Sequence, residues 1–208
     1  MSIAENLAAV EARISAACVR AGRKRSEVTL VAVSKTFPAE RVTEAIAAGV
    51  THIGENRVQE ARDKKPLVHG SARWHLIGHL QSNKAKDAVR IFDVIETVDS
   101  VELAQKVAAC DVLLQVNIGD EPQKSGIAPA DVESVVKQIH SIGGIRLVGL
   151  MAIPPIGDSR PYFRRLRQLR DQVGLQHLSM GMSEDFEAAI EEGSTMVRIG
   201  RAIFGPRG

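Results

Sequence analysis

Short runs of aliphatic residues alternate with longer amphipathic stretches along most of the chain. The runs are rich in Val, Ile and Leu, which is typical of strands buried on both faces of a parallel sheet. The stretches between them repeat apolar residues at three- and four-residue spacing, which predicts amphipathic helices. The predicted strands are residues 29–34, 52–54, 74–77, 92–97, 112–117, 146–150, 177–179 and 196–199. The predicted helices between them are residues 39–48, 57–64, 82–89, 100–109, 129–140, 161–173 and 184–191.

This alternation predicts βαβ units and therefore an α/β fold with a parallel sheet. Strands in this order close most economically into a single (β/α)8 barrel of the TIM type, preceded by an extra N-terminal helix over residues 2–21. An open doubly wound sheet is the alternative, but no G-x-G-x-x-G follows any predicted strand. Because no linker or shift in composition divides the chain, residues 1–208 are expected to form one domain. Barrels of this type usually have about 250 residues, so the loops must be short.

The composition excludes several classes of protein. The chain has 208 residues, of which 44% are hydrophobic and 25% charged, as in ordinary globular proteins. A net charge of +2 and an aromatic content of 3% give no signature of nucleic-acid binding. No run is apolar enough to span a membrane, and charges within residues 1–20 argue against a signal peptide. Cys18 and Cys110 lack metal-ligand spacing, and we expect free, mostly buried thiols in a reducing, cytoplasmic compartment.

A lysine directly follows the first predicted strand. The aliphatic run ends in Ser34-Lys35, and Pro38 opens the next helix, as proline does in a first turn. Side chains at the carboxyl ends of barrel strands face the ligand site. A lysine there can lose its proton at modest cost, and its neutral amine can form a Schiff base with an aldehyde. Position alone does not separate this function from that of a lysine whose amine simply reaches solvent.

Polar residues also follow the last two predicted strands. Residues 179–183 cross from a strand to a helix, and Ser183 suits an N-cap. Backbone N–H groups at such a helix start also bind phosphate, and barrels frequently hold phosphate in the loops after strands seven and eight. Gly200 would allow a second backbone segment to approach the phosphate, and Arg198 is placed to point toward the same ligand.

An amine and a phosphate site on one rim fit a ligand with an aldehyde at one end and a phosphate at the other. Pyridoxal 5′-phosphate (PLP) has this form, and its protein partner is a lysine. A phosphorylated sugar held by a class I aldolase lysine also fits, so these residues leave both ligands open. His75 and His79 lack a third ligand, and a strand does not place such a pair on one face, so no metal site is predicted.

Longer segments resemble the pyridoxal phosphate homeostasis (YggS/PROSC) family, whose barrel is similar to the alanine racemase N-terminal domain. They follow the family's order through nearly the whole chain. The matching segments are residues 32–36, 54–60, 74–84, 115–117, 124–126, 149–151, 178–183 and 193–205. The chain is shorter than the family pattern before Trp74, Val112 and Leu178, which affects partner surfaces and oligomeric state more than the lysine site.

The resemblance implies that PLP is bound to Lys35 as a Schiff base. It places Arg198 opposite the pyridine nitrogen and Asn56 near the cofactor ring. A guanidinium, which stays charged, disfavours protonation of that nitrogen and weakens the ring as an electron sink.

The resemblance also assigns the phosphate site. Ser183 and the backbone at Gly200 and Arg201 are implied to hold the phosphate, and Ser179 and Met182 are implied to line the same loop.

Two functions follow from the resemblance. The first is PLP homeostasis, in which a cytoplasmic monomer buffers PLP or delivers it to PLP-dependent apo-enzymes without a reaction of its own. The second is an amino-acid racemase, which needs an acid on the ring face opposite the lysine. Racemases of this fold type take a tyrosine from a second, β-rich domain. We expect no such domain here, and the only tyrosine, Tyr162, follows the sixth predicted strand, so the first function is favoured.

Overall fold

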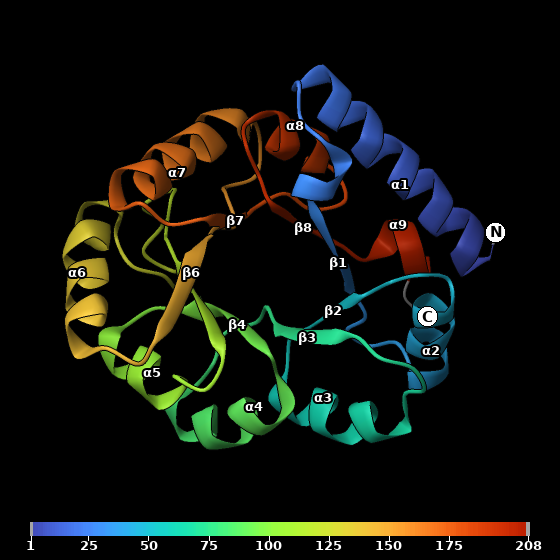
Figure 1. Cartoon of the computed structure of the whole chain (residues 1–208), viewed down its shortest axis with the longest axis horizontal. Coiled ribbons are helices and arrows are strands. Elements are labelled where there is room, and N and C mark those ends of the chain that lie inside the picture. The colour runs from blue at the N-terminus through green and yellow to red at the C-terminus, as the bar shows by residue number, and fades with distance from the viewer. Residues whose placement is uncertain (1, 207–208) are drawn as a thin grey trace.

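The computed structural model describes residues 2–206 and has a closed barrel of parallel strands surrounded by helices (Figure 1). Each strand pairs with the next along the chain, and β8 pairs with β1, which confirms the (β/α)8 barrel. The strands are β1 Thr29–Val33, β2 His52–Glu55, β3 Arg73–Leu76, β4 Val94–Val98, β5 Asp111–Gln115, β6 Arg146–Met151, β7 His177–Ser179 and β8 Met196–Ile199. The α-helices are α1 Ile3–Arg20, α2 Ala39–Ala47, α3 Val58–Lys64, α4 Ala85–Ile91, α5 Val101–Lys106, α6 Val132–Ile142, α7 Arg160–Val173, α8 Phe186–Glu191 and α9 Arg201–Phe204.

The predicted start of the helix after β7 is wrong. Helix α8 begins at Phe186, and its N-cap is Asp185 rather than Ser183. The carbonyl of Met182 accepts the N–H of Phe186 at 2.9 Å, and the carboxylate of Asp185 accepts the N–H of Met182 at 2.7 Å. The residues from Met182 to Asp185 therefore form a separate turn, which leaves Ser183 on a loop at the barrel rim. The short helix α9 was also missed, since its four residues are too few for a periodic pattern.

Helix α1 lies outside the ring, against α8 and α9 (Figure 1). Ser2 and Glu5 form a capping box at its start, and Ile3, Leu7 and Val10 belong to its buried face. The amide of Asn6 donates to the carbonyl of Ile203 at 2.9 Å. The predicted extra helix thus covers the junction between the first and last strands of the barrel.

The main apolar core lies between the sheet and the helices. A separate cluster of Val94, Leu113, Met151 and Met196 lies apart from it. Both cysteines are free and buried, as expected. Burial raises the pKa of the Cys110 thiol to about 11, so it stays protonated and unreactive at neutral pH. Among residues 2–206 no helix is long and apolar enough to cross a membrane.

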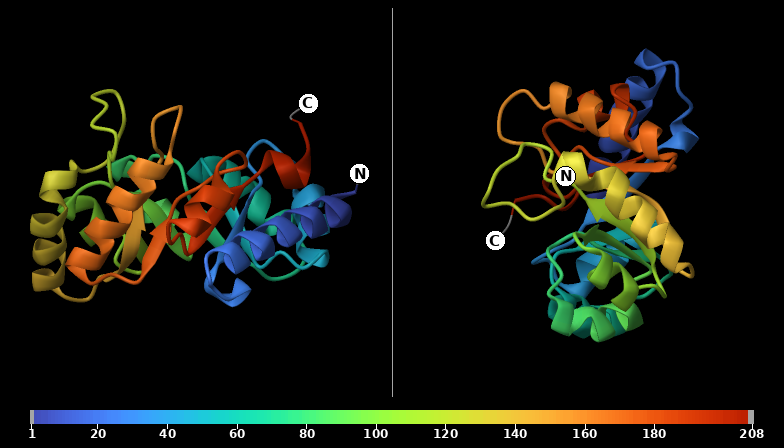
Figure 2. Two further views of the ribbon diagram at one scale, coloured as in Figure 1. Left: turned by 90° about the horizontal axis from the view of Figure 1, so that it is seen from above. Right: turned by 90° about the vertical axis from the view of Figure 1, so that its left-hand side faces the viewer.

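The loop from β5 to α6 and the loop from β6 to α7 project from the barrel on the same side (Figure 2). Both follow the carboxyl ends of their strands, where barrels hold their ligand sites. The Lys124 amine donates to the carbonyl of Pro154 at 3.3 Å and so links the two loops.

Candidate functional site

Lys35 lies in the turn that connects β1 to α2. Ser34 before it is fully buried, Lys35 is half-buried, and Thr36 after it is exposed. Thr36 has a φ of 70°, in the left-handed region that non-glycine residues rarely adopt. The helix begins after Pro38, as the sequence predicts. The backbone on both sides of Lys35 must therefore be held by contacts with other elements.

Those contacts come from the Lys64 cluster, which consists of Ser34, Glu55, Glu60 and Lys64. The buried Lys64 amine donates to the Ser34 carbonyl at 2.9 Å, to Glu55 Oε1 at 2.7 Å and to Glu60 Oε1 at 2.9 Å. The same Glu60 oxygen accepts the N–H of Thr36 at 2.6 Å. Helix α3 thus holds the residues on both sides of Lys35.

Glu55 is the buried anion of this cluster. Burial raises the pKa of its carboxyl, against the hydrogen bonds from Lys64 and the Ser34 hydroxyl. Glu55 Oε1 accepts from Ser34 Oγ at 2.6 Å, whereas Glu55 Oε2 has no hydrogen-bond partner among the described residues. The Lys64 ammonium is therefore needed to stabilise this carboxylate.

Arg198 belongs to a hydrogen-bonded chain of five side chains, the interior chain, from β2, β3, β4, β7 and β8. Arg198 Nη1 donates to Ser179 Oγ at 2.6 Å, and Ser179 Oγ donates to Glu96 Oε2 at 2.5 Å. Glu96 Oε1 contacts His75 Nδ1 at 2.7 Å, and His75 Nε2 contacts His52 Nδ1 at 2.8 Å. Strands β4 and β7 are not neighbours in the sheet, so the bond between Ser179 and Glu96 crosses the inside of the barrel.

The interior chain holds two opposite charges away from water. Arg198 and Glu96 are buried, with Nη1 and Oε2 4.0 Å apart. Burial opposes ionisation of Glu96, but the bonds from His75 and Ser179 and the Arg198 charge outweigh it and hold the pKa of Glu96 below its usual value. Burial, followed by the neighbouring His75 and Arg73, lowers the pKa of His52 to about 4. His52 is therefore neutral at physiological pH.

The predicted phosphate-site residues lie in the loops after β7 and β8. Met182 is 40% exposed, Ser183 is half-buried, and Arg201 lies on the surface 3.9 Å from Glu184. A Cβ on Gly200 would lie 3.0 Å from the Val33 carbonyl oxygen. The end of β8 therefore packs closely against Val33 at the end of β1, two residues before Lys35.

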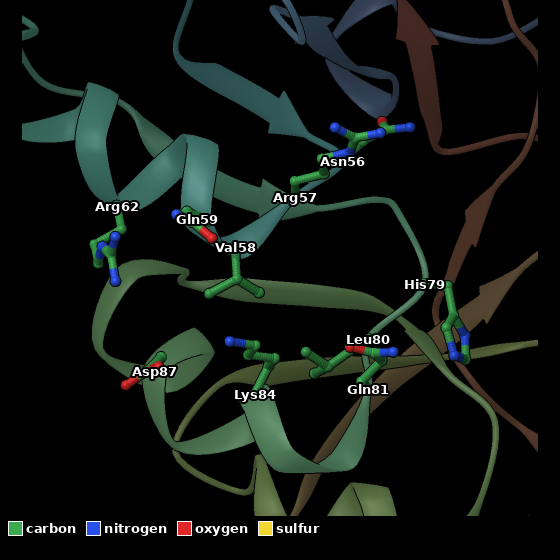
Figure 3. Close-up of a pocket in the computed structure, with 10 residues that line it drawn as sticks. All are labelled: Asn56, Arg57, Val58, Gln59, Arg62, His79, Leu80, Gln81, Lys84 and Asp87. Atoms are coloured by element: carbon green, nitrogen blue, oxygen red, sulfur yellow. The ribbon is translucent and has the colours of Figure 1, made fainter.

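Asn56 follows β2 on the same rim. It borders a cavity of about 350 Å³ between α3 and the segment before α4 (Figure 3). Figure 3 shows the Asn56 amide directed away from this cavity, while Lys84 lies on the opposite wall and Arg62 at its edge. His79 and His75 lie on opposite sides of this rim. His79 is exposed near Asp99, whereas His75 is buried inside the barrel.

The structure thus places Lys35, Asn56, Met182, Ser183, Gly200 and Arg201 at the carboxyl ends of their strands, and it joins Ser179 to Arg198 below them. Sequence reasoning missed Glu96 and Lys64, and it considered His75 only for a metal site. Of these three, only Glu96 could have been detected from the sequence, because a charged residue within the mostly apolar run from Val94 to Val98 indicates a buried carboxylate.

Known proteins share the sequence pattern and the fold of this chain. Residues 6–208 match the family model described as alanine racemase, N-terminal domain. The chain is 45% identical to the pyridoxal phosphate homeostasis protein of Pseudomonas aeruginosa, with 99% of this chain and 96% of the relative covered. It is 42% identical to the protein of the same name from Aquifex aeolicus, with 100% and 99% covered. That alignment extends over 226 positions, so the relative has residues that this chain lacks, in agreement with the prediction that the chain is shorter than the family pattern.

Solved structures show the same relationship. PipY of Synechococcus elongatus with PLP bound is 37% identical, with a TM-score of 0.83 and coverage of 98% of this chain and 100% of PipY. An alanine racemase from Clostridium difficile shares the fold, with a TM-score of 0.72 at 14% identity, and this chain covers 56% of its length. The chain therefore belongs to the pyridoxal phosphate homeostasis protein family, within the alanine racemase N-terminal domain fold.

Proposed function

We propose that this protein binds PLP at the carboxyl-terminal rim of the barrel and holds it on Lys35 as part of PLP homeostasis. The observation that carries this proposal is the position of Lys35 at the end of β1, in a turn held on both sides by the Lys64 cluster. A lysine needs a fixed backbone if its amine is to meet one aldehyde carbon in one orientation. The PLP found in the structure of PipY supports this choice of ligand.

The residues of the rim fit the two ends of such a ligand. PLP, when bound, would supply an aldehyde, and the amine of Lys35 would hold it covalently with release of water. Gly200 keeps the start of α9 close to β1, so the backbone of Gly200 and Arg201 lies near the turn that carries Lys35. We assign the phosphate to Ser183 and to the backbone of Gly200 and Arg201, and we place Met182 along the loop beside it.

Arg198 and Asn56 are assigned to the ring. The guanidinium of Arg198 would face the pyridine nitrogen and disfavour its protonation, since arginine keeps its own proton at neutral pH. Asn56, whose amide points away from the neighbouring cavity, would lie beside the ring (Figure 3).

We infer that the protein buffers or delivers PLP and has no reaction of its own. An unprotonated ring nitrogen is a poor electron sink, and Tyr162 lies on α7, packed against the core between the helix and the sheet. The names of the curated relatives describe homeostasis rather than catalysis. In this proposal the protein is a cytoplasmic monomer of one domain, and PLP-dependent apo-enzymes are the acceptors.

The test is reconstitution with PLP, followed by borohydride reduction and peptide mass mapping. We expect an absorption band that borohydride removes and a phosphopyridoxyl group on Lys35. Lys35→Ala should lose the adduct and keep the far-ultraviolet circular dichroism spectrum, whereas Lys24→Ala, a change in the loop before β1, should retain the adduct. A protein that takes up no PLP, or that traps a sugar phosphate instead, would contradict the proposal. Racemization of an L-amino acid that Lys35→Ala abolishes would replace homeostasis by catalysis.

A further inference from the structure

Barrels of this type usually fill their interior with layers of Val, Ile and Leu. Here the interior chain of His52, His75, Glu96, Ser179 and Arg198 occupies part of that space. A buried ion pair contributes little to stability compared with apolar side chains of similar volume, because both charges lose their hydration. The stability of the fold therefore does not account for the interior chain.

The direction of each hydrogen bond follows from the groups present. Arginine can only donate and a carboxylate can only accept, so the Ser179 hydroxyl accepts from Arg198 and donates to Glu96. The opposite carboxylate oxygen of Glu96 is held by His75. Every group between Arg198 and His75 thus has one arrangement, and none can rotate without breaking a bond of 2.5 to 2.7 Å.

The guanidinium of Arg198 is fixed at two different nitrogen atoms. Nη1 donates to Ser179, and Nη2 donates to the carbonyl of Ala152 at 3.0 Å. Two contacts at the two ends of a planar fork set its plane as well as its position. Because arginine does not release its proton, the interior chain cannot carry a proton to a ligand. Its remaining effect is on the orientation and charge of Arg198.

We propose that Glu96 and Ser179 are positioning residues that aim the Arg198 guanidinium at the ring nitrogen of the bound cofactor, with His75 holding Glu96 in place. This inference rests on the proposed function, because it needs PLP at the rim. It assigns Ser179 a role through Arg198 rather than through the phosphate loop. It also predicts that removing one neutral oxygen atom below the site changes the electronic state of the cofactor above it.

The experiment compares two fully buried serines, Ser179 at the end of β7 and Ser194 just before β8. Ser179→Ala removes the hydroxyl between Arg198 and Glu96. Ser194→Ala removes a hydroxyl of equal size, whose oxygen lies 2.8 Å from the carbonyl oxygens of both Met180 and Met196 and donates its one proton among such carbonyls. The readouts are the absorption maximum of the PLP-loaded protein, its pH titration and the PLP dissociation constant.

We expect Ser179→Ala to shift the absorption maximum and to weaken PLP binding about tenfold, which corresponds to the loss of one charge-assisted hydrogen bond. Ser194→Ala should leave the spectrum unchanged. Glu96→Gln provides a second variant and should shift the spectrum in the same direction. The double variant Ser179→Ala/Arg198→Gln should bind PLP no more weakly than Arg198→Gln, because both changes remove the same interaction.

Borohydride trapping on wild-type Lys35 separates the two proposals. If the wild-type protein forms no adduct, the proposed function fails, and this inference fails with it. If the wild-type protein forms the adduct but the spectrum of folded Ser179→Ala equals that of Ser194→Ala, only the positioning role is wrong. Effects of Ser179→Ala and Arg198→Gln that add in the double variant overturn it as well.

Discussion

The backbone oxygen of Asn56 lies 2.2 Å from the position that a Cβ on Gly78 would take. Gly78 has no positive φ, so its own conformation would suit other residues. Glycine is therefore needed here by the close approach of the segments after β2 and β3, and Asn56 is the residue that we place beside the cofactor ring. Gly149, whose Cβ would lie 2.3 Å from the His177 carbonyl oxygen, is a second such position.

Gly78→Ala should therefore destabilise the protein by about 3 kcal/mol, the usual size of a backbone clash in a packed site. It should also weaken PLP binding, since Asn56 must move. Chemical denaturation and PLP titration measure the two effects.

Gly143→Ala is the control for this change. Nothing lies within 4 Å of its Cβ position, and its φ of 72° makes the substitution unfavourable by only about 1 kcal/mol. Equal losses of stability in the two variants would show that the close approach of the Asn56 backbone is not the reason for glycine at position 78.

At the scale of elements, the turn after β1 depends on helix α3. Thr36 keeps a left-handed conformation, and the carboxylate that accepts its N–H belongs to Glu60, one turn before Lys64 on α3. The site lysine is thus positioned by an ion pair from the next βα unit.

Removal of the Glu60 carboxylate should loosen the turn. We expect Glu60→Ala to weaken PLP binding about five- to tenfold, because one charge-assisted hydrogen bond that orders the turn is lost. Glu60→Gln, which keeps an acceptor oxygen, should recover most of the affinity. Isothermal titration with PLP gives the comparison.

The control for Glu60 is Glu44→Ala, which removes an exposed carboxylate that pairs with Arg41 on α2. Affinities that are equal in Glu60→Ala and Glu44→Ala would mean that the turn is held without Glu60.

At the scale of the whole molecule, neutral His52 lies next to His75 in the interior chain. Its pKa is about 4 in the folded protein, against 6.5 for an unperturbed histidine. As the pH falls through this range the unfolded chain takes up a proton that folded His52 does not, so stability decreases. The stabilising contribution of neutral His52 is fully present above pH 6.5 and is lost below it. The polar interior therefore makes the stability of the barrel depend on pH in mildly acidic solution.

Between pH 7.5 and pH 5 we expect His52 to contribute a loss of about 2 kcal/mol in the free energy of unfolding. Urea denaturation at a series of pH values measures this slope. His52→Asn cannot titrate and should have a shallower slope by this amount. His177, whose pKa is also lowered by burial, titrates in both proteins and cancels in the difference. Parallel slopes in the two proteins would contradict the assignment.

The order of elements was available from the sequence because apolar periodicity reflects burial, and burial alternates regularly between strands and helices. The position after a predicted strand indicated Lys35, and the resemblance supplied the other rim residues. Element starts were less certain where a turn competes with a helix, as at Met182 and Asp185. Such a local hydrogen bond leaves no periodic signal.

The pattern of residues along the chain was enough to predict the barrel, the family and the strand ends on which the site lies. It did not predict that Lys64 and Glu60 hold the turn of Lys35 or that Glu96 lies beside Arg198, because these contacts form only in the folded barrel. Glu96 and Arg198 are separated by about half of the chain, and they meet because closure of the sheet brings non-neighbouring strands to face each other across its interior. Periodicity along a chain records which residues are buried, and closure in three dimensions determines which buried residues meet.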